Sequence, residues 1–257
     1  MSLRFTAFSL FPRFFDPLVE EGVFSRGLKQ GVLFFDTVNP RDFAQDVRRN
    51  VDGNPLGGGD GMVLLPDVCA KALDSVQTAN STVIHVSPGG KVFDHSWARY
   101  FAEKGEHLIF LCGRYAGFDQ RFVDSRSHFE LSIGDFVLSG GEPAAVCMMD
   151  SISRFVPGVL GNEQSALHDS FEDGLLEAPQ FTHPTEFAGQ NVPPVLLSGH
   201  HAEIARFRRS EQIRRTARQR PDLIIRLWEK LSRSEQKAAE SIWKSGQIDL
   251  SVGPRRR

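Results

Sequence analysis

The sequence predicts an α/β domain built on a mainly parallel sheet, followed by a smaller helical domain. Four short, apolar, β-prone runs, at 5–11, 32–38, 82–86 and 107–112, are each followed by turn residues or by a segment of helical period. That alternation is typical of parallel sheets whose strands are joined through helices. With 257 residues, 40% of them hydrophobic, the chain is long enough to bury a substantial core.

A long polar stretch interrupts this pattern between residues 40 and 61. It is rich in Asp, Arg and Gly, it ends in Gly57-Gly58-Gly59-Asp60-Gly61, and it is too long for an ordinary connection. We therefore expect a functional or mobile loop there. Helical patterning resumes at Pro66, since proline is tolerated in the first turn of a helix.

A helix over residues 142–155 is predicted to close the first domain. Pro143 suits its first turn, Pro157-Gly158 stops it, and its apolar residues follow a helical spacing: Ala145, Val146, Met149, Ile152 and Phe155. The polar segment after it has no period and is interpreted as a linker. The predicted organisation is a first domain over 1–161, a linker over 162–169 and a second domain over 170–257, with two or three helices filling 200–244.

Composition excludes several classes of protein. No apolar run approaches the roughly 20 residues of a membrane helix, and the first residues lack the apolar core of a secretory signal, so the default compartment is the cytoplasm. Three cysteines, Cys69, Cys112 and Cys147, are odd in number and far apart, and we interpret all three as small buried hydrophobic residues. No metal site is predicted, because His200 and His201 lack partners at a suitable spacing and are expected to be structural.

Basic charge is concentrated near the C-terminus, although the net charge of the chain is only −2. Seven arginines lie between Arg206 and Arg220, and only Glu211 opposes them. Such a density along a predicted helix fits the phosphate backbone of a nucleic acid. The alternative is an ordinary solvated helix face, and the charges alone do not decide between the two.

Two glycine-bearing loops, at 113–121 and 132–141, predict the site of a small ligand. Glycine permits close approach of the backbone and positive φ at little steric cost, so these loops suit a flat, polar molecule. The sequence lacks the motifs of two common nucleotide-binding sites. No GxGxxG follows the first strand, as in a Rossmann dehydrogenase, and the GxxxxGK[ST] of a P-loop NTPase does not occur.

A series of short motifs, distributed over most of the chain, resembles those of one enzyme family. In chain order they are Ser9-Leu10-Phe11-Pro12, Pro40-Arg41-Asp42-Phe43, Gly57-Gly58-Gly59, Gly61-Met62, Gly113-Arg114-Tyr115, Asp119-Gln120-Arg121, Ser132-Ile133-Gly134-Asp135, Ser139-Gly140-Gly141-Glu142, Arg154-Phe155, Pro157-Gly158-Val159-Leu160-Gly161, Asp169-Ser170-Phe171, Pro193-Pro194-Val195-Leu196 and Ser198-Gly199-His200-His201. The family is that of the bacterial tRNA (guanine-N1) methyltransferases, which modify position 37 beside the anticodon.

The resemblance implies a SPOUT methyltransferase fold, in which the C-terminal part of the α/β domain is threaded into a deep trefoil knot. It implies that S-adenosylmethionine binds bent in the knot and leaves as S-adenosylhomocysteine. The family forms obligate homodimers whose active sites combine residues of both subunits, and the linker and second domain grip the tRNA anticodon arm. A magnesium ion that assists the carboxylates is compatible with the family, although no sequence motif marks one.

Roles for single residues follow from the same resemblance. Asp169 matches the general base that removes the guanine N1 proton, and Arg154 matches the arginine that supports charge developing on O6. The structural alternatives are a turn cap for Asp169 and a helix C-terminal charge for Arg154. The methyl donor is expected to contact Ser87, Pro88, Gly89, Gly113, Tyr115, Ile133, Gly134, Phe136, Leu138, Gly140 and Gly141. The candidates for tRNA phosphates are Arg206, Arg208, Arg209, Arg214, Arg215 and Arg218.

The chain departs from the family pattern at several positions. Ala116 stands where the family has Glu between Tyr115 and Gly117, so a carboxylate of the substrate pocket is missing. Phe136 in place of Tyr keeps the ring, and Glu177 in place of Asp keeps the charge. Two alternatives to the family's activity therefore stay open: a homologue that binds RNA without methylating it, and a methyltransferase that acts on another RNA base.

Overall fold

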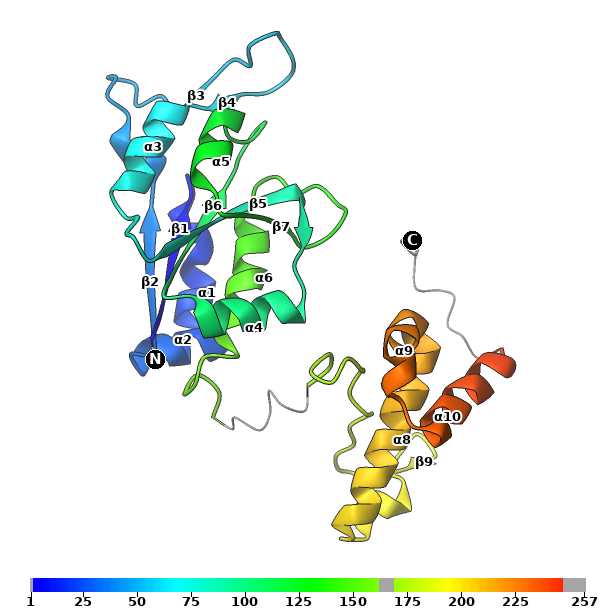
Figure 1. Cartoon of the computed structure of the whole chain (residues 1–257). Coiled ribbons are helices and arrows are strands. Elements are labelled where there is room, and N and C mark those ends of the chain that lie inside the picture. The colour runs from blue at the N-terminus through cyan, green and yellow to red at the C-terminus, as the bar shows by residue number, and fades with distance from the viewer. Residues whose placement is uncertain (1, 162–168, 247–257) are drawn as a thin grey trace. The chain divides into compact units, whose positions relative to one another are not determined.

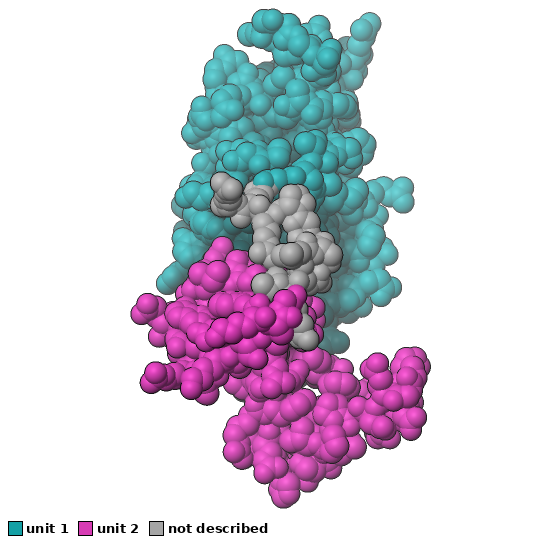
Figure 2. Space-filling view, turned by 90° about the vertical axis from the view of Figure 1, so that its right-hand side faces the viewer, with its two compact units in different colours: residues 1–166 teal, residues 167–257 magenta. Residues whose placement is uncertain are grey.

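The computed structural model describes residues 2–161 and 169–246. The chain divides into two compact units, Met1–Ala166 and Leu167–Arg257, which Figure 2 colours separately. Except for Asp169, the predicted linker at 162–169 lies outside the described residues. Within the described ranges, no helix is long and apolar enough to cross a membrane.

A five-stranded sheet with only parallel pairs forms the centre of unit 1, as the sequence predicts (Figure 1). Its spatial order is β2-β1-β6-β5-β7. The strands are β1 (Leu3–Phe8), β2 (Leu33–Val38), β5 (Ser81–Val92), β6 (His107–Cys112) and β7 (Phe129–Ser132). The last of these was not expected from the sequence, because β7 has only four residues.

Five α-helices connect the strands in the described part of unit 1, and a sixth follows the last strand: α1 (Asp16–Glu20), α2 (Gly22–Lys29), α3 (Pro66–Asp74), α4 (His95–Lys104), α5 (Gln120–Arg126) and finally α6 (Glu142–Ser153). Two of them begin where the sequence predicts, with Pro66 opening α3 and Pro143 in the first turn of α6. The helix α6 ends at Ser153, earlier than predicted, and Arg154 caps it.

Alternate residues of the sheet build a separate core on each face. Leu108 and Phe110 of β6 pack in one cluster with side chains of α2, α4 and α6, whereas Ile109 and Leu111 pack in a second cluster with α3 and α5. Figure 1 shows α3 and α5 in cyan and green, apart from α4 and α6. Because both faces are covered, β6 is buried at every position, which explains its continuous apolar sequence.

The cysteines correct one prediction. Cys69 and Cys112 are buried, as expected, but Cys147 is exposed. It lies on α6, whose buried face carries Ala145, Met148, Met149 and Ile152. A helical residue between those positions points away from the core, so an apolar neighbourhood in sequence is not burial. Burial, aided by the charge of Asp67, raises the pKa of the Cys69 thiol to about 12.

The 40–61 segment contains some regular structure. It begins with the 3-10 helix η2 (Pro40–Phe43) and includes β3 (Asp52–Gly53), which pairs antiparallel with β4 (Val63–Leu64). Gly57, Gly58 and Gly59 all have positive φ, from 85° to 125°. A side chain at any of them would be strained, which accounts for the three glycines in a row.

Unit 2 contains three α-helices, α8 (His201–Gln219), α9 (Pro221–Leu227) and α10 (Arg233–Lys244), among its described residues. A short hairpin of β8 (Glu186–Phe187) and β9 (Gln190–Asn191), which the sequence did not predict, precedes them. The unit has a small core of its own around Ile213, Ala217 and Ile224. The rings of Trp228 and Trp243 stack beside it, with centroids 5.6 Å apart.

Candidate active site

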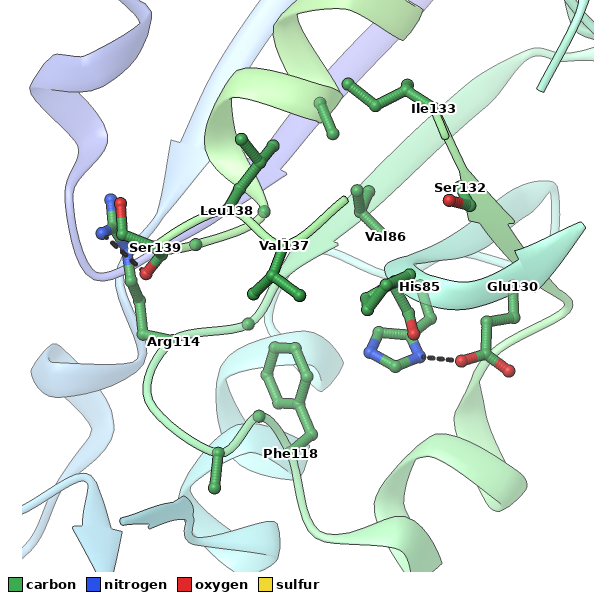
Figure 3. Close-up of a pocket in the computed structure, with 18 of the residues that line it drawn as sticks. His85, Val86, Arg114, Phe118, Glu130, Ser132, Ile133, Val137, Leu138 and Ser139 are labelled. Carbon is green, nitrogen blue, oxygen red and sulfur yellow. Dashed lines mark hydrogen bonds and ion pairs between the residues drawn. The ribbon is translucent and has the colours of Figure 1, made fainter. Parts of the chain in front are cut away.

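A cavity of about 370 Å³ lies beside the carboxyl-terminal parts of β5, β6 and β7 (Figure 3). His85, Val86 and Ser87 of β5 form one wall, the loop after β6 forms another, and residues from β7 to the start of α6 close the site. The three strands are parallel neighbours, so their carboxyl ends meet at one edge of the sheet. Ligands of parallel sheets bind at this edge.

Most residues predicted to contact the methyl donor line this cavity. Ten of the eleven do so: Ser87, Pro88, Gly113, Tyr115, Ile133, Gly134, Phe136, Leu138, Gly140 and Gly141. The exception is Gly89, which is not among the lining residues. Its backbone N–H donates to Ser87 Oγ at 3.1 Å, so it instead supports the turn that carries Ser87.

Glycines let three backbone segments meet at the cavity. A Cβ on Gly141 would lie 2.9 Å from Cys112 Cα, closer than packed atoms allow, and the Gly141 N–H donates to Gly113 O at 3.0 Å. A Cβ on Gly90 would lie 2.4 Å from Leu131 N. The β5–β7 pairing shifts register between Val86 and Lys91, so the intervening residues bulge from the ladder and shape the wall.

A buried ion pair joins two of the loops that line the cavity. Arg114 Nη2 lies 2.9 Å from Glu142 Oε2, and Arg114 Nε donates to Glu142 Oε1 at 3.2 Å. Ser9 Oγ donates to the same Oε1 at 2.6 Å. The guanidinium also lies over the Phe11 ring, 4.4 Å from its centroid, and Nη1 donates to Ser139 O. Direct contacts thus join the motifs around residues 9, 114 and 140.

His85 and Glu130 are cavity residues that the sequence reasoning missed. They oppose each other in the β5–β7 pairing, and His85 Nδ1 lies 3.4 Å from Glu130 Oε1. Burial lowers the pKa of His85, and Glu130 raises it only in part, so the net direction is downward and the ring is neutral at pH 7. The signal in the sequence that could have identified His85 was its polar side chain near the end of the otherwise apolar run at 82–86.

The two proposed catalytic residues belong to different units and do not line the cavity. Arg154 is the C-cap of α6 in unit 1. Asp169 begins the described part of unit 2, and its carbonyl accepts from the Glu172 N–H at 3.4 Å. Ala116 does line the cavity, so a methyl group stands there where the resemblance implies a carboxylate.

The six arginines proposed to bind phosphate all lie on α8 and differ in surroundings. Arg209 is held between Asp173 and Glu235, at 2.5 and 2.6 Å, and Arg215 Nη1 donates to Glu177 O at 3.2 Å. The other four are exposed: Arg206, Arg208, Arg214 and Arg218. Arg208 also lines a second cavity, of about 270 Å³, together with Phe181 and His183. Among the described residues, no group of three or more His, Cys, Asp or Glu could hold a metal ion.

Comparison with known proteins agrees with this geometry. The model of the family described as tRNA (Guanine-1)-methyltransferase TrmD matches residues 3–226. A tRNA (guanine-N(1)-)-methyltransferase of Burkholderia mallei (strain SAVP1) is 48% identical over 233 residues, 88% of each chain, and one of Burkholderia pseudomallei (strain 668) gives the same values. One of Burkholderia lata is 47% identical over 232 residues. Since the family match and these similarities cover most of its length, the chain belongs to the tRNA (guanine-1)-methyltransferase TrmD family.

Proposed function

We propose that this protein is an S-adenosylmethionine-dependent methyltransferase of the cytoplasm that modifies N1 of guanine 37 in tRNA. The observation that carries the proposal is the cavity at the carboxyl ends of β5, β6 and β7, where ten residues expected to hold the donor come together. Membership in the family and the printed names of the relatives support the reaction and the substrate class.

The cavity fits a donor of this size and chemistry. Its volume of about 370 Å³ lies within the range of sites for small organic ligands. Apolar side chains such as Val86, Ile133 and Leu138 can cover an adenine ring, while the glycines expose backbone amides and carbonyls to its polar edge. When bound, S-adenosylmethionine supplies an electrophilic methyl group on a positively charged sulfur.

The protein must then remove the guanine N1 proton and stabilise charge on O6. We assign the first task to the Asp169 carboxylate and the second to the Arg154 guanidinium. General base catalysis of this kind contributes about 10²–10⁴ in rate. A homodimer in which each subunit lends Asp169 to the other's site, as the resemblance to the family implies, is part of the proposal.

The trefoil knot belongs to the proposal as well. The segment from Ser139 to Gly141 is held against the loop after β6 by a bridge between Arg114 and Gly140 and by the Gly141–Gly113 hydrogen bond. We propose that these two contacting loops are the threaded segments of the knot. Such threading is rare, and it would hold the donor-binding backbone rigid.

Unit 2 is proposed to hold the anticodon arm. The exposed arginines of α8 can contact phosphates without reading sequence, and the target guanine must leave its stack to reach the cavity. Unstacking costs roughly a few kcal/mol, and less in an anticodon loop that is already distorted.

The test is methyl incorporation into defined RNA. The full chain is incubated with donor carrying a tritiated methyl group and with unmodified tRNA transcripts that have either G37 or A37. We expect label only in the G37 transcript, recovered as 1-methylguanosine after digestion to nucleosides. Label in the A37 transcript, or in another nucleoside, would refute the assigned target.

Ala116 favours one second candidate, a homologue that binds RNA and the donor without transferring the methyl group. The cavity lacks a carboxylate at this position. Calorimetric titration with S-adenosylmethionine, run beside the incorporation assay, separates the two functions. Donor binding together with undetectable incorporation into any tRNA would favour the second.

A further inference from the structure

The His85 side chain lies at the wall of the cavity and is only 14% exposed. Figure 3 shows its ring with one nitrogen directed at Glu130 and the other on the opposite edge. The Nδ1 atom is buried and makes no well-aligned hydrogen bond, although Glu130 Oε1 is 3.4 Å away. Buried polar atoms are nearly always hydrogen-bonded, so an unsatisfied ring nitrogen at a ligand cavity indicates a role in binding.

The surroundings fix the form of the imidazole. Because Nδ1 faces a carboxylate, the proton of the neutral ring belongs on Nδ1, and Nε2 is left as an acceptor. Among the described residues, Nε2 has no hydrogen-bond partner. The other elements packed against the ring present no charge to it: β6 places Leu111 beside it in register, and Phe118 contacts it edge-on. Arg114 lines the same cavity, but its guanidinium is bound to Glu142.

We propose that His85 is a donor-binding residue whose neutral ring, held by Glu130, accepts a hydrogen bond from S-adenosylmethionine at Nε2, and whose protonation weakens donor binding. The inference rests on the proposed function, since it places the donor in this cavity. The donor carries hydroxyl and ammonium groups that can donate to an imidazole.

The charge of the His85–Glu130 pair should distinguish the donor from the product. With His85 neutral, the pair it forms with Glu130 carries one negative charge, which favours the positively charged sulfur of the donor. A proton on His85 cancels that charge and removes the acceptor. The product S-adenosylhomocysteine has an uncharged sulfur. Protonation of His85 therefore costs the product only the hydrogen bond, whereas it costs the donor both the hydrogen bond and the attraction of its sulfur to the negative charge. Acid is therefore expected to weaken the donor more than the product.

Calorimetric titration of the full chain with S-adenosylmethionine and with S-adenosylhomocysteine, at pH 5.5 and pH 8, tests this. We expect donor affinity to fall at the lower pH by less than about tenfold, because the lowered pKa of His85 leaves the ring only partly protonated there, and product affinity to fall by a smaller factor. The variant His85→Gln keeps a polar group that does not titrate and is expected to abolish the difference between the two pH values. His85→Phe is expected to bind the donor weakly at both, and His201→Gln, an exposed histidine of α8, serves as the control that behaves as wild type.

A second readout follows the protonation of the His85 ring directly. The C2 proton of His85, assigned by its loss in His85→Gln, is followed by NMR against pH. Donor binding is expected to lower the titration midpoint, by reciprocal linkage with the pH effect on affinity. Equal pH effects on donor and product, or a midpoint that the donor leaves unchanged, would overturn the role of His85. Failure of wild type to bind the donor at either pH would instead refute the proposed function.

Discussion

Arg114, which lines the cavity, and Glu142 form a two-point ion pair, with the Glu142 carboxylate completely buried. Arg114 follows β6, and Glu142 is the first residue of α6, so the contact fixes two loops that line the cavity. Removing one partner of a buried pair leaves the other without its counter-charge. The resulting fall in the free energy of unfolding is far larger than the fall caused by breaking an exposed pair.

We therefore expect Glu142→Ala to lower the free energy of unfolding by about 3–5 kcal/mol and to weaken donor binding. Urea unfolding and calorimetry of the same preparation measure the two effects. The matched control is Asp74→Ala, which removes an exposed pair with Arg126 and should cost no more than about 1 kcal/mol. Equal losses in the two variants would show that the Arg114–Glu142 pair has no special role.

Restoring a carboxylate at Ala116 tests the clearest departure from the family pattern. Guanine presents N–H donors on its N1 and N2 edge, and a charged acceptor there is worth about 1.5–3 kcal/mol, or roughly tenfold or more in rate. We expect Ala116→Glu to raise the rate of methyl transfer to the G37 transcript by about that factor. Ala116→Gln is the uncharged control, with a smaller gain. An unchanged rate in Ala116→Glu would mean that the carboxylate is unimportant here.

The sequence predicts the parallel sheet and the loops that line the cavity, for a physical reason. Apolar strands and glycine loops are local signals, and the parallel connection rule brings their carboxyl ends together. The pairing of His85 with Glu130 could not be predicted, because it depends on the register between β5 and the unexpected strand β7. Cys147 was misjudged since its exposure depends on which face of α6 the core covers.

Sharing of active sites between subunits is testable by mixing two inactive variants. Asp169→Ala and Arg154→Ala are each expected to abolish methyl transfer while the donor still binds. If a site takes its aspartate from one subunit and its arginine from the other, a mixed dimer has one intact site, so a refolded equimolar mixture should regain about a quarter of wild-type activity. A mixture as inactive as its components, with mixed dimers shown by differential tagging, would place both residues in the same subunit's site.

The stability of unit 2 should depend on pH through Glu235. Burial alone would raise the pKa of this carboxyl, but hydrogen bonds from Ser232 and Arg209 outweigh it and hold the pKa below its usual value. A carboxylate whose pKa is lowered by folding stabilises the fold above its unfolded-state pKa, and the contribution disappears as the pH falls through the folded-state pKa. The stability of unit 2 should therefore be level near neutral pH and decline in acid.

Fluorescence of Trp228 and Trp243 in a Trp97→Phe background reports on unit 2, since these are the three tryptophans of the chain. Unfolding in urea at a series of pH values should show the decline, and Glu235→Gln should reduce it. Asp222→Asn, at a more exposed pair with Arg220, should have a smaller effect. A pH profile that Glu235→Gln leaves unaltered would contradict the assignment.

Binding of tRNA should depend steeply on salt, because each phosphate contact releases condensed counterions. Arg214 and Arg218 are exposed and four residues apart, so they share a face of α8, whereas Arg209 is tied to Asp173 and Glu235. We expect Arg214→Ala and Arg218→Ala each to weaken binding and to reduce the slope of log K against log salt by about one. Arg209→Ala should instead destabilise unit 2. A slope near zero in wild type, or one that neither exposed variant reduces, would exclude this helix as the phosphate-binding surface.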